Sequence, residues 1–412
     1  MLDPTGLVYG VVMSKTTSRL LTAAAVLGLL SGVARAECES PSRFPAWLEN
    51  FKEEAAAQGV SERALSALEG VAYDPAVIKR DRSQSVFAQD FLTFSNRMVA
   101  PYRLKQGAAL IAKYRPIFQQ VERRYGVPAP VIVAFWALET DFGANMGDFS
   151  TLRSLATLAF DCRRPEKFRP QLLAALQILD EGDLQPDDLV GAWAGEVGQV
   201  QFLPKDYIES GVDFDGDGRR DLRHSIPDVI ASTANLLVHH GWRAGEPWLE
   251  EVSVPDDLPW EEADIAVVHP RAQWVKWGVT GRNGKLRADK VEASLLLPMG
   301  RNGPAFIAYP NFTDAYLLWN ESLVYSTTAA YLATRLAGAP PVSKGRGPID
   351  ILSRQEMITL QKLLARRGYD VGKIDGVAGA KTRAAVKDMQ TKFGMPADSW
   401  PTSEFLSRLQ SG

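Results

Sequence analysis

One glutamate stands where the surrounding sequence would make its carboxyl group reactive. Glu139 closes the apolar run GVPAPVIVAFWALETDFG at residues 126–143. From Val131 to Leu138 this run is apolar on every face of a helix, so we expect a buried helix that Gly143 stops. Burial disfavours the charged carboxylate and raises its pKa, which suits a general acid at neutral pH. The competing interpretation is an ion pair between Glu139 and an arginine at the helix end.

The sequence offers no obvious second carboxylate for this glutamate. A glycosidase usually pairs its acid with a nucleophile or with a base that activates water. Asp141 lies two residues on, so it points to another face of the helix. The sequence alone does not place Asp148 or Glu196. This pattern favours a reaction in which one carboxyl group serves first as acid and then as base.

A second group with chemical potential is the acidic loop DFDGDGRRDLRH at residues 213–224. Its aspartates occupy positions 1, 3, 5 and 9 of an EF-hand loop, with a glycine at the turn and a backbone carbonyl at position 7. His224 replaces the glutamate expected at position 12, and Asp228 would substitute only if the following turn differs. We predict a weak structural Ca²⁺ site, against a solvated acidic turn. The predicted ligands are Asp213, Asp215, Asp217, the Arg219 carbonyl and Asp221.

Helical periodicity surrounds both groups. Apolar residues recur at helical spacing from Phe44 to about Leu249, with Pro, Gly and Asp as punctuation. Between about 250 and 310 short β-prone pieces predict a small inserted antiparallel sheet. Helical spacing then returns before a linker rich in proline and glycine at 339–348. We predict a mainly α (α+β) fold with a second, small helical unit at 349–412.

Several stretches match the motifs of a known family. Glu139-Thr-Asp-Phe-Gly143 and GAWAGEVGQVQFLP at 191–204 resemble the E-T-x-x-G and G-S-x-A-G-A-x-G-x-x-Q-F-x-P motifs of the B-type lytic transglycosylases. Tyr309-Pro-Asn-Phe312 and Trp319-Asn320 resemble that family's later substrate-cleft motif. The resemblance runs from about Phe44 to Leu336 in the family's order.

This resemblance implies a fold, a reaction and a set of contacts. The fold is a lysozyme-like helical catalytic domain, here 37–338. The reaction cleaves the β-1,4 bond between N-acetylmuramic acid and N-acetylglucosamine of peptidoglycan without a cofactor, and the muramyl 6-hydroxyl attacks its own C1. Glu139 would protonate the departing oxygen and then accept the hydroxyl proton. The implied substrate contacts are Gln201, Tyr309, Asn311, Trp319, Asn320, Gly195 and Gly198.

Each contact also has a simpler interpretation. Gln201 would hydrogen-bond an acetamido group, and the two glycines would let the backbone approach the glycan closely. The polar residues could instead be satisfied groups near the core, and the glycines could form an exposed turn.

The chain departs from the family motifs at three positions. Ala192 replaces a serine, which removes any hydrogen bond from that hydroxyl to the sugar. Trp319 replaces a tyrosine, which keeps a ring and loses a hydroxyl. Glu196 replaces an alanine; facing Glu139, it would raise one pKa by like-charge repulsion and open a water-activating role. We expect a solvated surface glutamate instead.

The C-terminal unit carries a second resemblance. LQKLLARRGYDVGKIDGVAGAKTRAAVKDMQ at 360–390 resembles the type 1 peptidoglycan-binding domain. Its spacing assigns apolar residues to the core rather than to ligand contacts. They are Leu360, Leu363, Ile374, Val386 and Met389. The implied role is to hold the enzyme on the cell wall and raise the local substrate concentration.

The N-terminal residues predict export. Lys15 and Arg19 precede an apolar run that is too short for a comfortable membrane span. Ala34-Arg35-Ala36 then forms a small-x-small cleavage site, so residues 1–36 are predicted to be a signal peptide. We place its natural start at Met13.

The mature chain is predicted to be periplasmic and without a lipid anchor, because Glu37 before Cys38 is not the small residue that lipidation requires. Two cysteines in an oxidising compartment predict a Cys38–Cys162 disulfide, against two buried free thiols.

Composition and motifs leave three functions in view. The first is a lytic transglycosylase acting on peptidoglycan glycan strands as a monomer, with cell-wall synthesis or remodelling proteins as candidate partners. A muramidase that uses water is the second, and an active second carboxylate would favour it. The third is a wall-binding scaffold without activity, which Ala192 and Glu196 keep open. A net charge of -3, from 46 basic and 49 acidic residues, excludes nucleic acid as the expected partner.

Overall fold

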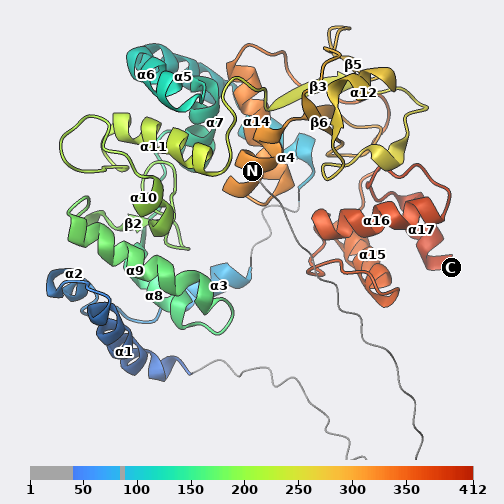
Figure 1. Cartoon of the computed structure of the whole chain (residues 1–412). Helices are drawn as coiled ribbons and strands as arrows, with labels where there is room; N and C mark the ends of the chain where they lie inside the picture. The colour runs from blue at the N-terminus through green and yellow to red at the C-terminus, as the bar shows by residue number, and fades with distance from the viewer. Residues whose placement is uncertain (1–39, 84–88, 412) are drawn as a thin grey trace, which may run out of the picture. The chain divides into compact units, whose positions relative to one another are not determined.

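The computed structural model describes residues 40–83 and 89–411, and most of them are helical (Figure 1). The predicted signal peptide and Cys38 lie outside the described residues. The first helices are α1 (Phe44–Ala57), α2 (Glu62–Ser66), α3 (Pro75–Arg82), α4 (Phe91–Met98), α5 (Pro101–Lys113), α6 (Arg115–Tyr125), α7 (Ala129–Thr140), α8 (Thr151–Phe160) and α9 (Pro165–Glu181). The remaining helices are α10 (Pro204–Ser210), α11 (Ile226–His239), α12 (Arg271–Lys276), α13 (Leu317–Trp319), α14 (Leu323–Leu336), α15 (Arg354–Arg366), α16 (Ala380–Lys392) and α17 (Ser403–Ser411). Single turns are η1 (Pro41–Arg43), η3 (Pro186–Asp188), η4 (Trp260–Glu262) and η5 (Phe312–Tyr316).

The strands form an antiparallel sheet, as predicted, and a small second pair. The sheet has the order β4-β6-β7-β3-β5. Its strands are β3 (Leu249–Ser253), β4 (His269–Pro270), β5 (Thr280–Gly281), β6 (Glu292–Leu296) and β7 (Ala305–Ala308). The second pair joins β1 (Phe149–Ser150) to β2 (Val190–Gly191), and the sequence analysis did not predict it.

Both faces of the larger sheet are covered. Leu296 and Phe306 pack into the core of the helical domain, while Leu295 and Ile307 pack into a separate cluster with Trp274. Side chains alternate along a strand, so successive residues of β6 and β7 reach opposite cores. This two-sided burial explains why β7 is entirely apolar and why β6 ends in two leucines.

The helix α7 lies at the centre of the helical domain. It packs against α14, α5 and α11, and every residue from Val131 to Leu138 is buried. The prediction of a buried helix is confirmed. A helix that is apolar on all faces needs other elements around it, and these elements fix the direction in which its last turn points.

The end of α7 differs from the prediction. The helix stops at Thr140, before Gly143, and Asp141 and Phe142 already have left-handed backbones with φ of 55° and 62°. Residues other than glycine rarely adopt this conformation. Asp141 is held there because its carboxylate accepts hydrogen bonds from Tyr102 (2.8 Å) and Arg103 (3.0 Å) of α5.

The C-terminal helices α15 to α17 form their own apolar core. A capping box between Ser353 and Glu356 begins α15. Of the predicted core residues, Ile374 is 44% exposed. That part of the prediction is wrong, because Ile374 lies in the irregular segment between α15 and α16 and not on a packed helix face.

Polar contacts join this unit to the rest of the chain. Arg383 of α16 donates a hydrogen bond of 2.7 Å to the Leu297 carbonyl, and Lys387 forms a salt bridge of 3.1 Å with Asp264. Trp400 belongs to the same apolar cluster as α7. The predicted linker is therefore followed by a packed unit and not by a free tether.

Cys162 follows α8 and is disulfide-bonded. Its expected partner, Cys38, lies outside the described residues, so the pairing of the two remains a prediction.

Candidate active site

Glu139 lies in the last turn of α7 and is half-buried. Its Oε1 accepts a hydrogen bond of 2.8 Å from the indole Nε1 of Trp319 and another from the hydroxyl of Tyr325. Across residues 40–83 and 89–411, no basic side chain forms a salt bridge with Glu139. The alternative interpretation, an ion pair with an arginine, is therefore wrong for the described residues.

The surroundings of Glu139 bring its pKa close to neutrality. Burial raises the pKa of Glu139 to about 7, which outweighs the opposite effect of the hydrogen bonds from Tyr325 and Trp319. The nearby carboxyl group of Glu196 raises it further. A carboxyl group with this pKa is present in both its acid and its base form at neutral pH, which one residue needs to serve in both roles.

Trp319 is held firmly beside Glu139. Its ring stacks on Phe135 of α7, with centroids 4.2 Å apart, and meets the edge of Phe202 at 5.7 Å. Where the family motif has a tyrosine, Trp319 thus supplies a hydrogen-bond donor to the acid through its indole nitrogen.

Tyr325 is the contact that the sequence analysis missed. It lies in the first turn of α14, and burial raises its pKa well above the ordinary value, so its hydroxyl remains a donor. One signal was available: Ser322 caps a new helix immediately after Asn320, and its side chain accepts from the Tyr325 amide. A tyrosine in that first turn lies next to the motif and could have been included.

The stretch from Gly191 to Pro204, here called the motif loop, folds back on itself. Val197 bridges both Gly191 and Phe202. Gln201 has a left-handed backbone with φ of 53°, and its side-chain nitrogen donates to the carbonyls of Gly198 (2.9 Å) and Met146 (3.2 Å). Gln201 is half-buried, so its amide is anchored by the loop while part of it remains accessible to a ligand.

The two glycines of the motif loop serve internal packing. A Cβ atom at Gly195 would lie 2.3 Å from Leu155, and one at Gly198 would lie 2.5 Å from the Leu222 carbonyl oxygen. Both residues are buried, so an exposed turn does not fit them. The packing explains why both positions are glycine, and a substrate-binding role of Gly195 and Gly198 stays a prediction.

Glu196 is not the solvated surface group that we expected. It is half-buried, and its Oε2 is enclosed without a hydrogen-bond partner among the described residues. Burial raises its pKa, while hydrogen bonds from the backbone at Glu196 and Ala194, and then the charge of Lys167 on α9, oppose that change. Since Glu196 also raises the pKa of Glu139, it belongs to the electrostatic surroundings of the acid. Asp148, the other candidate for a second carboxylate, is exposed.

Two other predicted substrate contacts are corrected. Tyr309 is fully buried, and its hydroxyl accepts from Arg271 (2.8 Å) and donates to Glu250 (2.8 Å). Asn311 is also fully buried; its side chain ties down the turn after α11 through the backbone of Arg243. Both are satisfied polar residues of the scaffold.

Asn320 is half-buried, and its side chain accepts from the Ser322 amide at 2.9 Å. It shapes the turn between Trp319 and Tyr325, the two donors to Glu139.

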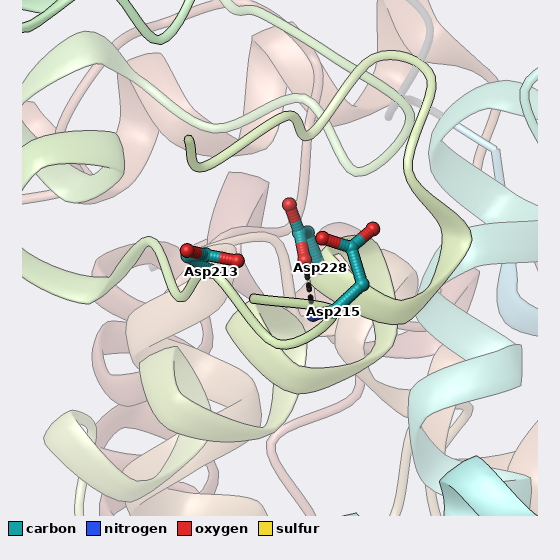
Figure 2. A group of neighbouring side chains, drawn as sticks. All are labelled: Asp213, Asp215 and Asp228. Carbon is teal, nitrogen blue, oxygen red and sulfur yellow. Dashed lines mark hydrogen bonds between the residues drawn. The ribbon is translucent and has the colours of Figure 1, made fainter. Parts of the chain in front are cut away.

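The acidic loop gathers a different set of aspartates from the one predicted. Oxygen atoms of Asp213, Asp215 and Asp228 lie within 4.8 Å of one another (Figure 2). Asp217 instead pairs with Arg219. Asp221 turns away to accept from the His224 amide.

Asp228 comes from the first turn of α11 and braces the loop. Its carboxylate accepts from the backbone amides of Phe214 (2.8 Å) and Asp221 (2.8 Å). The three clustered carboxylates supply the hard oxygen ligands that Ca²⁺ prefers. The described residues therefore fit a cation, with Asp228 in place of the usual glutamate.

Comparison with known proteins identifies the family. The model of the transglycosylase SLT domain matches residues 43–334, and that of a putative peptidoglycan binding domain matches residues 353–409. The first match covers more than half of the chain, so the chain belongs to the transglycosylase SLT domain family. Both resemblances found in the sequence, to the B-type lytic transglycosylases and to a peptidoglycan-binding domain, are confirmed.

Individual relatives agree with this assignment. Membrane-bound lytic murein transglycosylase B of Escherichia coli (strain K12) is 34% identical over 157 residues, which cover 38% of this chain and 43% of that protein. The match thus spans less than half of that relative.

Solved structures extend the similarity to the fold. SltB3 from Pseudomonas aeruginosa, crystallised in complex with NAG-anhNAM-pentapeptide, is 41% identical, with a TM-score of 0.82 over 89% of this chain and 99% of that one. The Escherichia coli lytic transglycosylase Slt35 in complex with calcium is 26% identical, with a TM-score of 0.61 over 70% of this chain and 92% of that one. The predicted fold class is confirmed.

Proposed function

We propose that this protein cleaves the β-1,4 bond between N-acetylmuramic acid and N-acetylglucosamine in peptidoglycan, with Glu139 as its single acid and base. The observation that carries this proposal is a carboxyl group at the end of a buried apolar helix, held by two neutral donors, the indole N–H of Trp319 and the hydroxyl of Tyr325, and with a pKa that burial raises to about 7. The relative crystallised with an anhydromuramyl product supports the same reaction.

The reaction would proceed in two steps. Protonated Glu139 gives its proton to the glycosidic oxygen as the bond from that oxygen to the muramyl C1 breaks. The resulting carboxylate, stabilised by the donors Trp319 and Tyr325, then takes the proton of the muramyl 6-hydroxyl. At the same time the oxygen of that hydroxyl bonds to C1. Glu139 is protonated again at the end, and water is not consumed.

The positive charge at C1 needs compensation between these steps. The substrate's own acetamido carbonyl would supply it, so no enzymic nucleophile is required. The half-buried Gln201 would orient that acetamido group through its anchored amide.

Hydrolysis, the runner-up, would require a second carboxylate that activates water. Glu196 suits that role poorly: burial raises its pKa, which disfavours the charged form that a base needs, and its enclosed Oε2 does not meet solvent.

Mass spectrometry of the products released from purified peptidoglycan tests this proposal. Wild-type protein should release muropeptides lighter than the reducing forms by one water molecule, and Glu139→Gln should release almost none. Reducing products of full mass would instead establish hydrolysis, and the absence of products from both proteins would favour a scaffold.

We also propose that the protein acts in the periplasm after removal of residues 1–36. Across residues 40–83 and 89–411, no helix is both long and apolar enough to cross a membrane. The C-terminal helices would bind the wall and keep the cleft close to its substrate. A Cys38–Cys162 disulfide would tie the mature N-terminus to the end of α8.

A structural Ca²⁺ at Asp213, Asp215 and Asp228 is a further part of the proposal. A relative was solved in complex with calcium, and a cation would relieve repulsion among the three carboxylates. Ca²⁺ should add about 1 kcal/mol or more to the free energy of unfolding of the wild-type protein, which should raise its melting temperature by a few degrees. Asp213→Asn should abolish this rise. Equal rises in both proteins would exclude the site.

A further inference from the structure

Gln199 joins three segments of the catalytic domain through its own hydrogen bonds. It lies in the motif loop, at a position that the family motif leaves unspecified, and is 7% exposed. Its side-chain oxygen accepts from the Trp136 indole nitrogen at 2.9 Å, and its side-chain nitrogen donates to the Arg223 carbonyl at 2.8 Å. Its backbone carbonyl accepts from the Thr140 hydroxyl at 2.5 Å, and its backbone amide donates to the Leu222 carbonyl at 2.8 Å.

Two of these bonds grip α7 on either side of Glu139. Trp136 lies three residues before the acid, and Thr140 follows it directly. The Thr140 hydroxyl oxygen also accepts from the Gly143 amide at 2.8 Å. A Cβ atom at Gly143 would lie only 2.5 Å from the Gln199 side-chain oxygen. The residues that end α7 are thus packed directly against Gln199.

The other two bonds attach Gln199 to the end of the acidic loop. Arg223, whose carbonyl accepts from Gln199, also donates its guanidinium to the Val190 carbonyl of β2 at 2.8 Å. The motif loop is therefore hydrogen-bonded to the end of the acidic loop as well as to α7. Because the loop is itself fixed in this way, its bonds to α7 restrain the last turn of that helix.

Without such a restraint, the last turn of α7 would be free to move. The carbonyls of a helix end lack partners within the helix, and here two strained left-handed residues follow at once. A small displacement of that turn would move the Glu139 carboxyl group away from Trp319 and Tyr325. Displacements of about 1 Å at a reacting group cost on the order of 100-fold in rate.

We propose that Gln199 is a positioning residue of the transglycosylase reaction, which acts through Glu139 by fixing the last turn of α7 against the motif loop. This inference rests on the proposed role of Glu139 as the acid. No contact between Gln199 and the substrate is proposed, because both polar atoms of its buried side chain bond within the protein.

The test compares two buried glutamines of the same domain. Gln199→Met keeps the length of the side chain and removes both hydrogen bonds of the side-chain amide. Gln171→Met is the matched control, because Gln171 of α9 is 8% exposed and its side-chain oxygen accepts from the Lys205 amide at 2.9 Å. Both variants should lose some thermal stability. Only Gln199→Met should lower kcat, by about 10-fold to 100-fold, with KM changed far less.

The pH profile gives a readout that a merely structural role would not move. Loosening the last turn would let water reach Glu139 and reduce the effect of burial on its pKa. The loss of kcat/KM with rising pH should therefore begin at lower pH in Gln199→Met than in wild type and in Gln171→Met.

Two outcomes would overturn the inference. A wild-type kcat and pH profile in Gln199→Met, with stability lowered as in the control, would leave Gln199 a purely structural residue. If Gln199→Met does not fold, Thr140→Val removes the hydrogen bond to the Gln199 carbonyl, together with the one from the Gly143 amide, and must show the same shift of the pH profile. Activity retained in Glu139→Gln would refute the proposed function itself, and the inference with it.

Discussion

Two buried tyrosines of the catalytic domain both donate their hydroxyl hydrogen to a glutamate, yet they stand in opposite electrostatic settings. Tyr309, after β7, donates to Glu250 and also accepts from Arg271, whose guanidinium lies 3.8 Å from Glu250. Tyr325, at the start of α14, donates to Glu139, which also accepts from the Trp319 indole. Glu250 has a cation nearby, whereas the side-chain donors to Glu139 in the described part of the chain are both neutral.

This difference separates a structural carboxylate from a reactive one. Glu250 lies beside Arg271 and accepts from the buried Tyr309, so it forms part of the scaffold. Neutral donors in an apolar wall stabilise the charge only in part, so the proton of Glu139 can leave and return near pH 7. Breaking each interaction in turn should therefore damage activity at one site and stability at the other.

The largest effect is expected from Glu139→Gln. This change keeps the shape of the side chain and removes the transferable proton, so kcat should fall by about 10³-fold. Release of soluble muropeptides from peptidoglycan would measure it. An unchanged melting temperature would show that the loss is chemical, and a fall of less than about tenfold would refute the role of Glu139 as acid and base.

Tyr325→Phe should have the next largest effect. It removes one hydrogen bond to the carboxylate that forms in the first step, a loss of about 1.5 to 3 kcal/mol, or roughly 10-fold to 100-fold in kcat. That bond lowers the pKa of Glu139, so its removal should move the loss of activity with rising pH to higher pH. A pH profile identical to that of the wild type would contradict this assignment.

Glu196→Gln should produce a smaller effect in the opposite direction. The carboxyl group of Glu196 raises the pKa of Glu139, and its effect is the smallest of those acting there. Removing its charge should move the loss of activity to lower pH and reduce kcat/KM above neutrality by a few-fold. Glu209→Gln, an exposed glutamate of α10, is the control. Equal profiles in the two variants would remove Glu196 from the site.

Tyr309→Phe should affect activity least, with kcat within about twofold of wild type. The change should lower stability, because the buried Arg271 and the half-buried Glu250 each lose one hydrogen bond. About 1 kcal/mol or more should be lost, and the melting temperature should fall by a few degrees. A large fall in kcat at an unchanged melting temperature would return Tyr309 to the substrate cleft.

Local pattern was enough to find the acid and the helix that carries it. A run that is apolar on all faces and ends in a carboxyl group defines burial and desolvation together, and α7 bears this out. The inserted sheet was also predictable from short β-prone pieces between turn residues. These features depend on neighbours in the sequence.

Contacts between distant segments were not predictable in this way. Tyr325 reaches Glu139 across 186 residues of sequence, and Gln199 meets Trp136 only because the motif loop folds back on α7. Motif resemblance did not distinguish Trp319, which touches the acid, from Tyr309 and Asn311, which are enclosed by the scaffold. Whether a polar residue faces the cleft or the core depends on tertiary packing.

The enclosed oxygen of Glu196 has a consequence for anyone who sets out to make this protein more heat-resistant. A buried carboxyl oxygen without a partner is costly to the folded state. A screen for thermostable variants would therefore favour its replacement, and Glu196→Ala would be among the first changes retained. Such a screen would select proteins that withstand heating but are active over a narrower pH range, so that stability is gained at the expense of activity through one side chain.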